Sequence, residues 1–129
     1  SLKNLATITG FHKRGVSQLA FSNDGSLLAS VGLDNDHSIA VYDWRRGQLV
    51  ASSKGDQAKV LALAFTPQDK EIVICGIKFV KFFTVQGRSM RARKGILGRK
   101  GKIQTMLSIG FVNDDTVIGT ASGHLSRFR

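Results

Sequence analysis

A short apolar string recurs three times along this chain, and each copy carries a phenylalanine at its fourth position. The strings occupy residues 18–22 (QLAFS), 62–66 (ALAFT) and 108–112 (SIGFV), and their phenylalanines are Phe21, Phe65 and Phe111. These phenylalanines are separated by 44 and 46 residues. Self-similarity at such a period indicates a repeat architecture, in which each unit buries its apolar face against the next one.

Turn residues follow each string, and short β-rich segments follow each turn. The turns are residues 23–25 (NDG), 67–70 (PQDK) and 113–115 (NDD), and a later segment of each copy ends on Tyr42, Phe83 or Phe128. Turns at this spacing between β-branched and aromatic segments predict an all-β meander, and no segment keeps a helical apolar period. We expect strands at residues 16–21, 27–31, 38–43, 48–52, 60–65, 72–75, 79–84, 106–111, 116–119 and 124–128, with one more at 5–8.

The first repeat resembles the WD-repeat consensus at four positions. His12 precedes the first strand, Ser30 stands at the serine of the second strand, and Asp36 lies six residues before Tyr42, which replaces the tryptophan. The resemblance implies a hydrogen-bonded structural tetrad of His12, Ser30, Asp36 and Tyr42, because a buried polar group left unpaired costs about 1–3 kcal/mol. The later repeats lack the aspartate and have Ile77 and Ser122 there. The chain therefore resembles a partial WD-repeat β-propeller of about three four-stranded antiparallel blades.

The turn before the third strand of the first repeat is longer than in generic WD repeats. This turn and the residues around it resemble one family within that group. Residues 13–22, the turn at 35–37 (NDH) and residues 41–44 (VYDW) are similar to the signature of the echinoderm microtubule-associated-protein-like family, as are residues 75–76, 79–83 and 119–125. In that family a pair of fused propellers forms the globular part, and its members associate with microtubules. The resemblance implies a non-enzymatic scaffold of the cytoplasm and cytoskeleton that binds tubulin or other cytoskeletal partners, with further proteins bound on a propeller face.

We expect residues 1–129 to form a single propeller segment, with repeats at about 5–43, 48–84 and 88–128. Three blades would leave two unpaired ends, and proteins normally pair or cover such strand edges. The chain is therefore interpreted as a fragment of a larger propeller domain. The alternative is association of two copies through their open blade edges, with residues 5–8 of one copy completing the third blade of the other.

Positive charge is concentrated in one stretch of the chain. The net charge is +10, and the span from residue 72 to residue 113 holds nine cations and no acid. Within this span, residues 87–102 combine cations with four glycines, and we interpret them as an outer strand followed by a basic loop. Charge gathered in this way indicates an acidic partner. The predicted partner-binding residues are Arg88, Arg91, Arg93, Lys94, Arg99, Lys100 and Lys102.

Two kinds of partner suit this basic segment, and a third interpretation of its charge needs no partner. The acidic surface of tubulin is favoured by the family resemblance, and RNA is the alternative because its phosphates attract the same cations. The segment contains no aromatic residue, so it lacks the stacking platform typical of single-strand binding. Without a partner, the charges would serve only to keep a sheet edge from aggregating.

No residue pattern indicates a cofactor, a metal site or a catalytic site. Residues 34–37 (DNDH) offer oxygen ligands, but calcium needs six to eight of them with a bidentate acid further on, so a turn is expected. His12, Ser30 and Asp36 lack the Gly-x-Ser-x-Gly elbow of a hydrolase. The lone Cys75 is expected to be a buried residue in a reducing compartment, and no apolar run reaches the roughly 20 residues that span a membrane.

Overall fold

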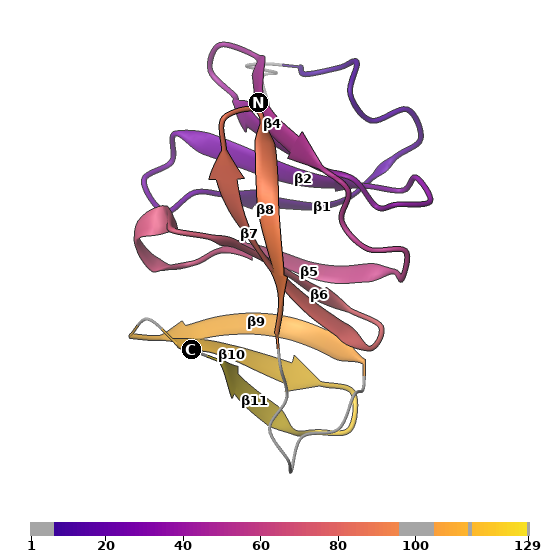
Figure 1. Cartoon of the computed structure of the whole chain (residues 1–129), viewed down its shortest axis with the longest axis vertical. Coiled ribbons are helices and arrows are strands. Elements are labelled where there is room, and N and C mark those ends of the chain that lie inside the picture. Colours follow the sequence, from indigo (N-terminus) through magenta and orange to yellow (C-terminus); the bar gives the residue numbers. More distant parts are fainter. Residues whose placement is uncertain (1–6, 96–104, 114, 129) are drawn as a thin grey trace, which may run out of the picture.

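The computed structural model describes residues 7–95, 105–113 and 115–128, and nearly all of its regular structure is β-strand (Figure 1). One short 3-10 helix, η1 (Pro67–Asp69), lies in the described part. The strands are β1 (Val16–Phe21), β2 (Leu27–Gly32), β3 (Ile39–Asp43), β4 (Gln48–Ser53), β5 (Val60–Phe65), β6 (Ile72–Gly76), β7 (Phe79–Gln86), β8 (Ser89–Lys94), β9 (Met106–Val112), β10 (Asp115–Thr120) and β11 (Leu125–Phe128).

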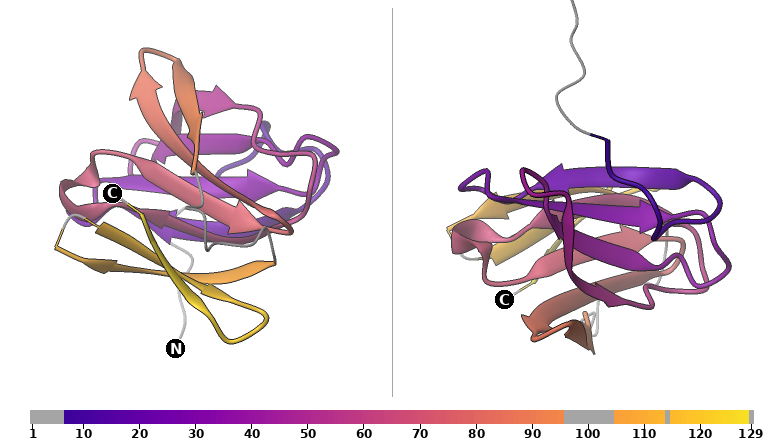
Figure 2. Two further views of the ribbon diagram at one scale, coloured as in Figure 1. Left: turned by 60° about the horizontal axis from the view of Figure 1, so that its bottom comes forward. Right: turned by 90° about the horizontal axis from the view of Figure 1, so that it is seen from above.

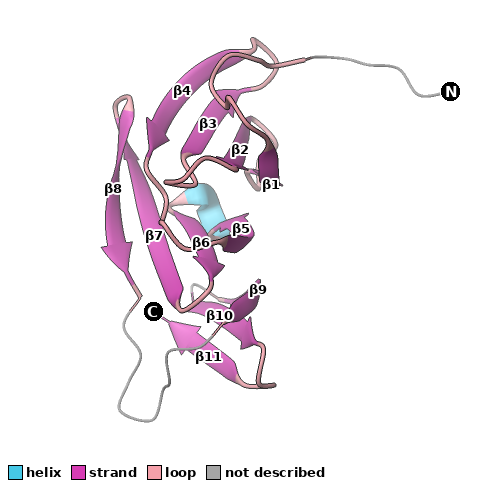
Figure 3. Cartoon of the chain, turned by 90° about the vertical axis from the view of Figure 1, so that its right-hand side faces the viewer, coloured by secondary structure: helices cyan, strands magenta, loops and turns pink. Residues whose placement is uncertain are grey.

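The strands form three antiparallel sheets that follow one another along the chain. The sheets have the orders β1-β2-β3-β4, β5-β6-β7-β8 and β9-β10-β11. Strand β1 contacts β5, and β5 contacts β9, so the first strand of each sheet lies on the same side of the stack, while β4 and β8 lie on the opposite side (Figure 3). Each sheet is therefore one blade, with an inner first strand, and the expected all-β partial propeller is confirmed.

Equivalent residues occupy the same place in all three blades. The first strand of each blade has a register irregularity near its start, which skips Ser17, Leu61 or Leu107. Near the other end of that strand, a row of directly paired residues crosses each blade from the repeated phenylalanine to the terminal aromatic residue. The rows are Phe21, Leu28 and Tyr42; Phe65, Ile72 and Phe83; and Phe111, Thr116 and Phe128.

Apolar side chains from neighbouring blades form two cores. The first core joins blade one to blade two and contains Val31, Val41, Phe65 and Phe83. The second joins blade two to blade three, with Phe82, Met106 and Phe128 among its residues, and Phe111 packs against it. Stacking of successive blades thus supplies the burial that one four-stranded sheet could not supply alone.

The repeated phenylalanines differ in exposure because each faces the preceding blade. Phe65 is 6% exposed, since it packs against the residues of blade one, whereas Phe21 is 58% exposed. Val16 and Leu19 of β1 are exposed beside Phe21. The face of β1 that points away from blade two therefore presents apolar side chains of the kind that a neighbouring blade covers.

Most expected strands agree with the observed ones to within two residues, and two features differ. The strand expected at residues 5–8 is not found where the structure describes the chain, because Thr7 and Ile8 are not in a strand and residues 5 and 6 lie outside the described part. The sequence repeat and the blade are also offset by one strand. Strand β4 opens the repeat 48–84 but pairs with β3, and β8 opens the repeat 88–128 but pairs with β7.

Cys75 lies in the second core and is fully buried. Burial raises the pKa of its thiol to about 12, so it packs as a small apolar side chain. Within the described part of the chain, no helix is long and apolar enough to cross a membrane.

Candidate partner-binding surface

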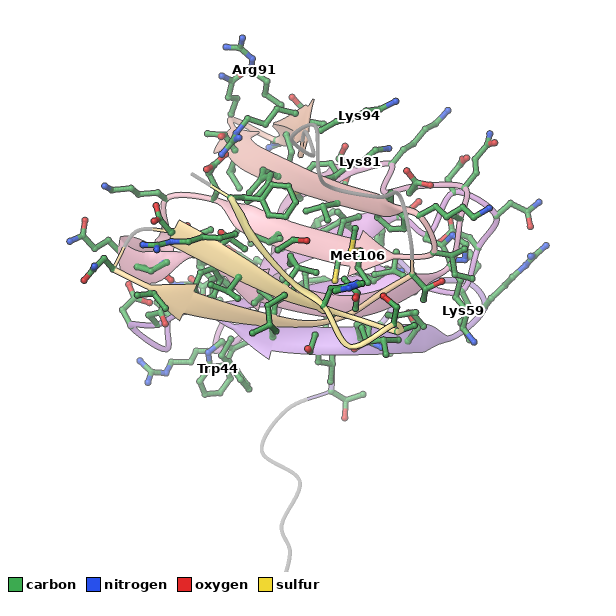
Figure 4. All side chains as sticks on the ribbon, turned by 90° about the horizontal axis from the view of Figure 1, so that it is seen from below. Trp44, Lys59, Lys81, Arg91, Lys94 and Met106 are labelled. Atoms are coloured by element: carbon green, nitrogen blue, oxygen red, sulfur yellow. The ribbon has the colours of Figure 1, made fainter. Side chains whose placement is uncertain are left out.

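Strand β8 carries the described part of the basic segment on a projecting hairpin. Strand β7 has eight residues, and its far end pairs with β8 around a two-residue turn at Gly87 and Arg88, in which Gly87 adopts a φ of 62°. This conformation costs glycine no steric strain. The hairpin extends beyond the end of β6 (Figure 2), and its tip reaches β4. The exposed residues Arg88, Arg91, Arg93 and Lys94 lie on its turn and its second strand. Figure 4 shows the side chains of Arg91 and Lys94 pointing outward.

Arg93 is held in one orientation by residues of its own blade. Its Nε and Nη2 atoms donate to the two carboxylate oxygens of Glu71 at 3.0 and 2.8 Å, and its guanidinium lies 4.2 Å from the ring centroid of Phe82. The hydrogen bonds with Glu71 raise the pKa of Arg93. Two-point pairing and stacking fix the plane of this guanidinium, so Arg93 presents a preformed edge of the surface.

A cavity of about 580 Å³ lies beside the end of β8, between blades two and three. Its walls include Lys78, Lys81, Lys94 and Asp56 above the apolar side chains of Met106 and Phe128. The Lys81 Nζ atom donates to the Gly55 carbonyl oxygen and lies 2.9 Å from Asp56 Oδ2. Burial alone would raise the pKa of Asp56, but hydrogen bonds from Lys81 and the Ala58 amide lower it. The rim therefore keeps a net positive charge from Lys78 and Lys94.

The predicted residues Arg99, Lys100 and Lys102 lie outside the described residues. Of the predicted cationic site, the structure thus brings together Arg88, Arg91, Arg93 and Lys94. The structure adds Lys78 and Lys81, which lie outside the basic segment of the sequence. These two residues lie near the turn from β6 to β7, and only the pairing of Lys81 with Lys94 across β7 and β8 brings them close to the basic segment.

A second predicted group, the blade network, lies within the first blade. His12 Nε2 and Ser30 Oγ are 2.7 Å apart, and Ser30 is only 3% exposed. Burial raises the pKa of Tyr42, and a side-chain hydrogen bond with Ser30 acts in the opposite direction. Three of the four predicted tetrad residues therefore form one connected group.

The carboxylate beside this group belongs to Asp34, and not to Asp36, which the spacing in the sequence predicts. Burial lowers the pKa of His12, and the charge of Asp34 acts to raise it. Asp34 accepts hydrogen bonds from the amide and the hydroxyl of Ser38 at 3.0 and 2.7 Å. These two bonds fold the longer turn back toward His12, whereas Asp36 contributes its carbonyl oxygen to the amide of Gly55.

The turn at residues 34–37 is held by hydrogen bonds within the protein. The His37 amide donates to the Asp34 carbonyl, and His37 Nδ1 lies 2.7 Å from the Asp56 carbonyl oxygen. No group of three or more metal-ligating side chains occurs among the described residues. The sequence predicts a turn in which Asp and Asn side chains bond their own backbone; Asp34 does so through the Ser38 amide, whereas Asn35 Oδ1 accepts from Arg14 Nη1 at 3.1 Å.

Stability is expected to fall as the pH drops through the range in which the unfolded His12 gains its proton. The pKa of His12 is lowered in the folded state, so the unfolded chain binds this proton at a higher pH than the folded chain does. Below about pH 6.5, the free energy of unfolding therefore decreases with decreasing pH. Urea denaturation at several pH values measures this slope, and His12→Gln should make it shallower. An unchanged slope in His12→Gln would show that another group is responsible.

Comparison with known proteins gives one consistent match over the whole chain. A family model described as "Echinoderm microtubule-associated protein first beta-propeller" matches residues 1–129. Over 120 residues, 90% of this chain, it is 36% identical to echinoderm microtubule-associated protein-like 1 of Rattus norvegicus, 34% identical to echinoderm microtubule-associated protein-like 2 of Mus musculus, and 32% identical to the 77 kDa echinoderm microtubule-associated protein of Lytechinus variegatus. The matched region spans 15% of the first of these relatives and 18% of the other two.

Proposed function

Because this chain belongs to the family of the first β-propeller of echinoderm microtubule-associated proteins, we propose that it is part of a non-enzymatic scaffold that associates with microtubules through its basic surface. The names of its relatives describe microtubule-associated proteins. The scaffold would act at the cytoskeleton in the cytoplasm, and it would hold its partners by contacts alone.

The observation that carries this proposal is the exposed cationic hairpin of blade two. Arg88, Arg91 and Lys94 have no carboxylate within 4 Å among the described residues, and Arg93 is neutralised by Glu71 alone. Unpaired cations on a projecting hairpin attract an acidic surface over a distance of about 8–10 Å at moderate salt. Tubulin is the acidic partner that suits the names of the relatives.

The blade network supports a structural role for the residues that most resemble a catalytic pair. Ser30 is buried at 3% exposure, and its hydroxyl is already engaged by His12 and Tyr42. A nucleophile must be reachable by its substrate and must be activated by an oriented base. We assign His12, Ser30, Asp34 and Tyr42 to the stability of the first blade.

Co-sedimentation of the chain with polymerised tubulin tests the proposal. The pelleted fraction should fall steeply as salt rises from about 0.05 M to about 0.3 M, because screening shortens the reach of the exposed charges. Competition by RNA at physiological salt, with microtubules displaced, would support RNA as the partner of the basic surface. Absent or salt-insensitive pelleting of the folded chain would contradict the proposal.

A further inference from the structure

Strand β8 is the outer edge of its sheet, and its hydrogen-bonding pattern shows which backbone groups face outward. Among the strands that the structure describes, β8 pairs with β7 alone. The Gly95 amide donates to the Val80 carbonyl at 2.8 Å. In an antiparallel pair, hydrogen-bonded and non-hydrogen-bonded residues alternate, so the backbone groups of Arg93 and Arg91 also face β7. The N–H and C=O groups of Met90, Ala92 and Lys94 therefore point away from the sheet.

These outward-facing backbone groups occur at every second residue of β8 and form an unpaired edge. Among the described residues, no backbone hydrogen bond engages Met90, Ala92 or Lys94 on that side. The equivalent edge of blade one is partly occupied, because the Ser52 amide of β4 donates to the Arg88 carbonyl at the tip of the hairpin. The row from Met90 to Lys94 is thus open to pairing with another chain.

The charge of the β8 edge differs from that of β4, the outer strand of blade one. Strand β4 reads QLVASS and has no charged residue, whereas β8 reads SMRARK and has three cations. Cations at an edge can guard it against aggregation. The β4 edge, which carries no cation, is partly occupied by the Arg88 carbonyl and has less need of such a guard. The cations of β8 also make its open edge complementary in charge to an acidic strand.

We propose that the edge of β8 binds an extended acidic peptide as an added β-strand. Backbone pairing with Met90, Ala92 and Lys94 supplies the affinity, and carboxylates two residues apart on the added strand face Arg91 and Arg93, which lie on one face of the sheet. The charge of Arg93 is already balanced by Glu71, so Arg91 supplies the net positive charge on this face. The guanidinium of Arg93 is oriented by Glu71 and Phe82 and can add a hydrogen bond with little loss of side-chain freedom. This inference rests on the proposed function only in taking the partner to be acidic. It adds that the partner binds as an extended β-strand.

The test uses a peptide of alternating glutamate and threonine and measures its binding to the whole chain by fluorescence anisotropy. Ala92→Pro removes only an N–H group that faces away from β7, a position at which edge strands accept proline. This variant should bind the peptide at least tenfold more weakly than the wild type. Ala92→Thr keeps the N–H group and should bind like the wild type, and far-ultraviolet circular dichroism compares the folds of all three proteins.

Two further arms separate an added strand from simple charge attraction. The same peptide, N-methylated at every second residue, keeps its charge but loses half of its backbone donors, and it should bind at least tenfold more weakly. Equal binding of the methylated peptide, or equal binding by a folded Ala92→Pro chain, would overturn the inference. An oligoribonucleotide that binds the Ala92→Pro and wild-type chains alike, and binds the wild-type chain more tightly than the acidic peptide does, would also overturn it. None of these outcomes requires a loss of microtubule pelleting, so pelleting tests the proposed function independently of this inference.

Discussion

Phe65→Ala is expected to lower the free energy of unfolding by about 3–5 kcal/mol, the range typical of a buried phenylalanine. Phe65 is 6% exposed and belongs to the core shared by blades one and two, which also includes Val31 and Val41 of blade one. Its truncation removes apolar burial and leaves a cavity between two rigid sheets. Urea denaturation of the variant measures the loss. Phe65→Leu serves where the alanine variant does not fold, with an expected loss of about 1–2 kcal/mol.

Phe21→Ala is the matched control, because Phe21 occupies the same place in blade one. It pairs with Leu28 as Phe65 pairs with Ile72, but it is 58% exposed and makes its aromatic contact with Trp44 at 5.8 Å between ring centroids. An edge contact of this kind contributes about 0.5–1.5 kcal/mol, so Phe21→Ala should cost about 1 kcal/mol. Equal losses at the two positions would contradict the stacking of blade one on blade two.

The blade pattern could be predicted from the sequence because it depends on local residue order. Phe21, Phe65 and Phe111 mark the inner strands, and the aromatic residues Tyr42, Phe83 and Phe128 mark the third strands that pair into the same rows. Strand β8 was harder to delimit, because SMRARK has no β-branched residue and its strand conformation comes from pairing with β7. Propensity is weak at such positions, and tertiary pairing decides them.

The site was less predictable because its contacts join distant residues. Spacing from Tyr42 selected Asp36, whereas the hydrogen bonds from Ser38 bring Asp34 to His12 instead. The pairing of Arg93 with Glu71 spans 22 residues, and that of Lys81 with Asp56 spans 25. Such pairs follow from the register of β6, β7 and β8 and from the path of the interblade connection. No local motif encodes either one.

A triple substitution of Arg88, Arg91 and Lys94 by glutamine should weaken microtubule binding about tenfold, which corresponds to about 1.4 kcal/mol. Each of these exposed cations is expected to contribute about 0.2–1 kcal/mol to contact with an acidic surface. Arg93 is left unchanged because it contacts Glu71 and Phe82 within the blade. The free energy of unfolding should therefore stay close to that of the wild type, since the three substituted residues lie on the exposed hairpin.

The matched control removes the same charge from other places. Lys13, Lys54 and Lys70 are exposed and lie outside β8 and its turn, so their replacement by glutamine lowers the net charge equally. If the total charge alone governed binding, both triple variants would lose affinity to the same extent. If the hairpin is the contact surface, only the first variant loses it.

The central claim is that the cationic hairpin of blade two is the surface through which this propeller segment meets microtubules. The dissociation constants of the two triple variants, measured side by side by co-sedimentation at one salt concentration, test it most directly. The claim predicts about tenfold weaker binding for the hairpin variant and nearly wild-type binding for the control. Equal binding by both variants, with both chains folded, would contradict it.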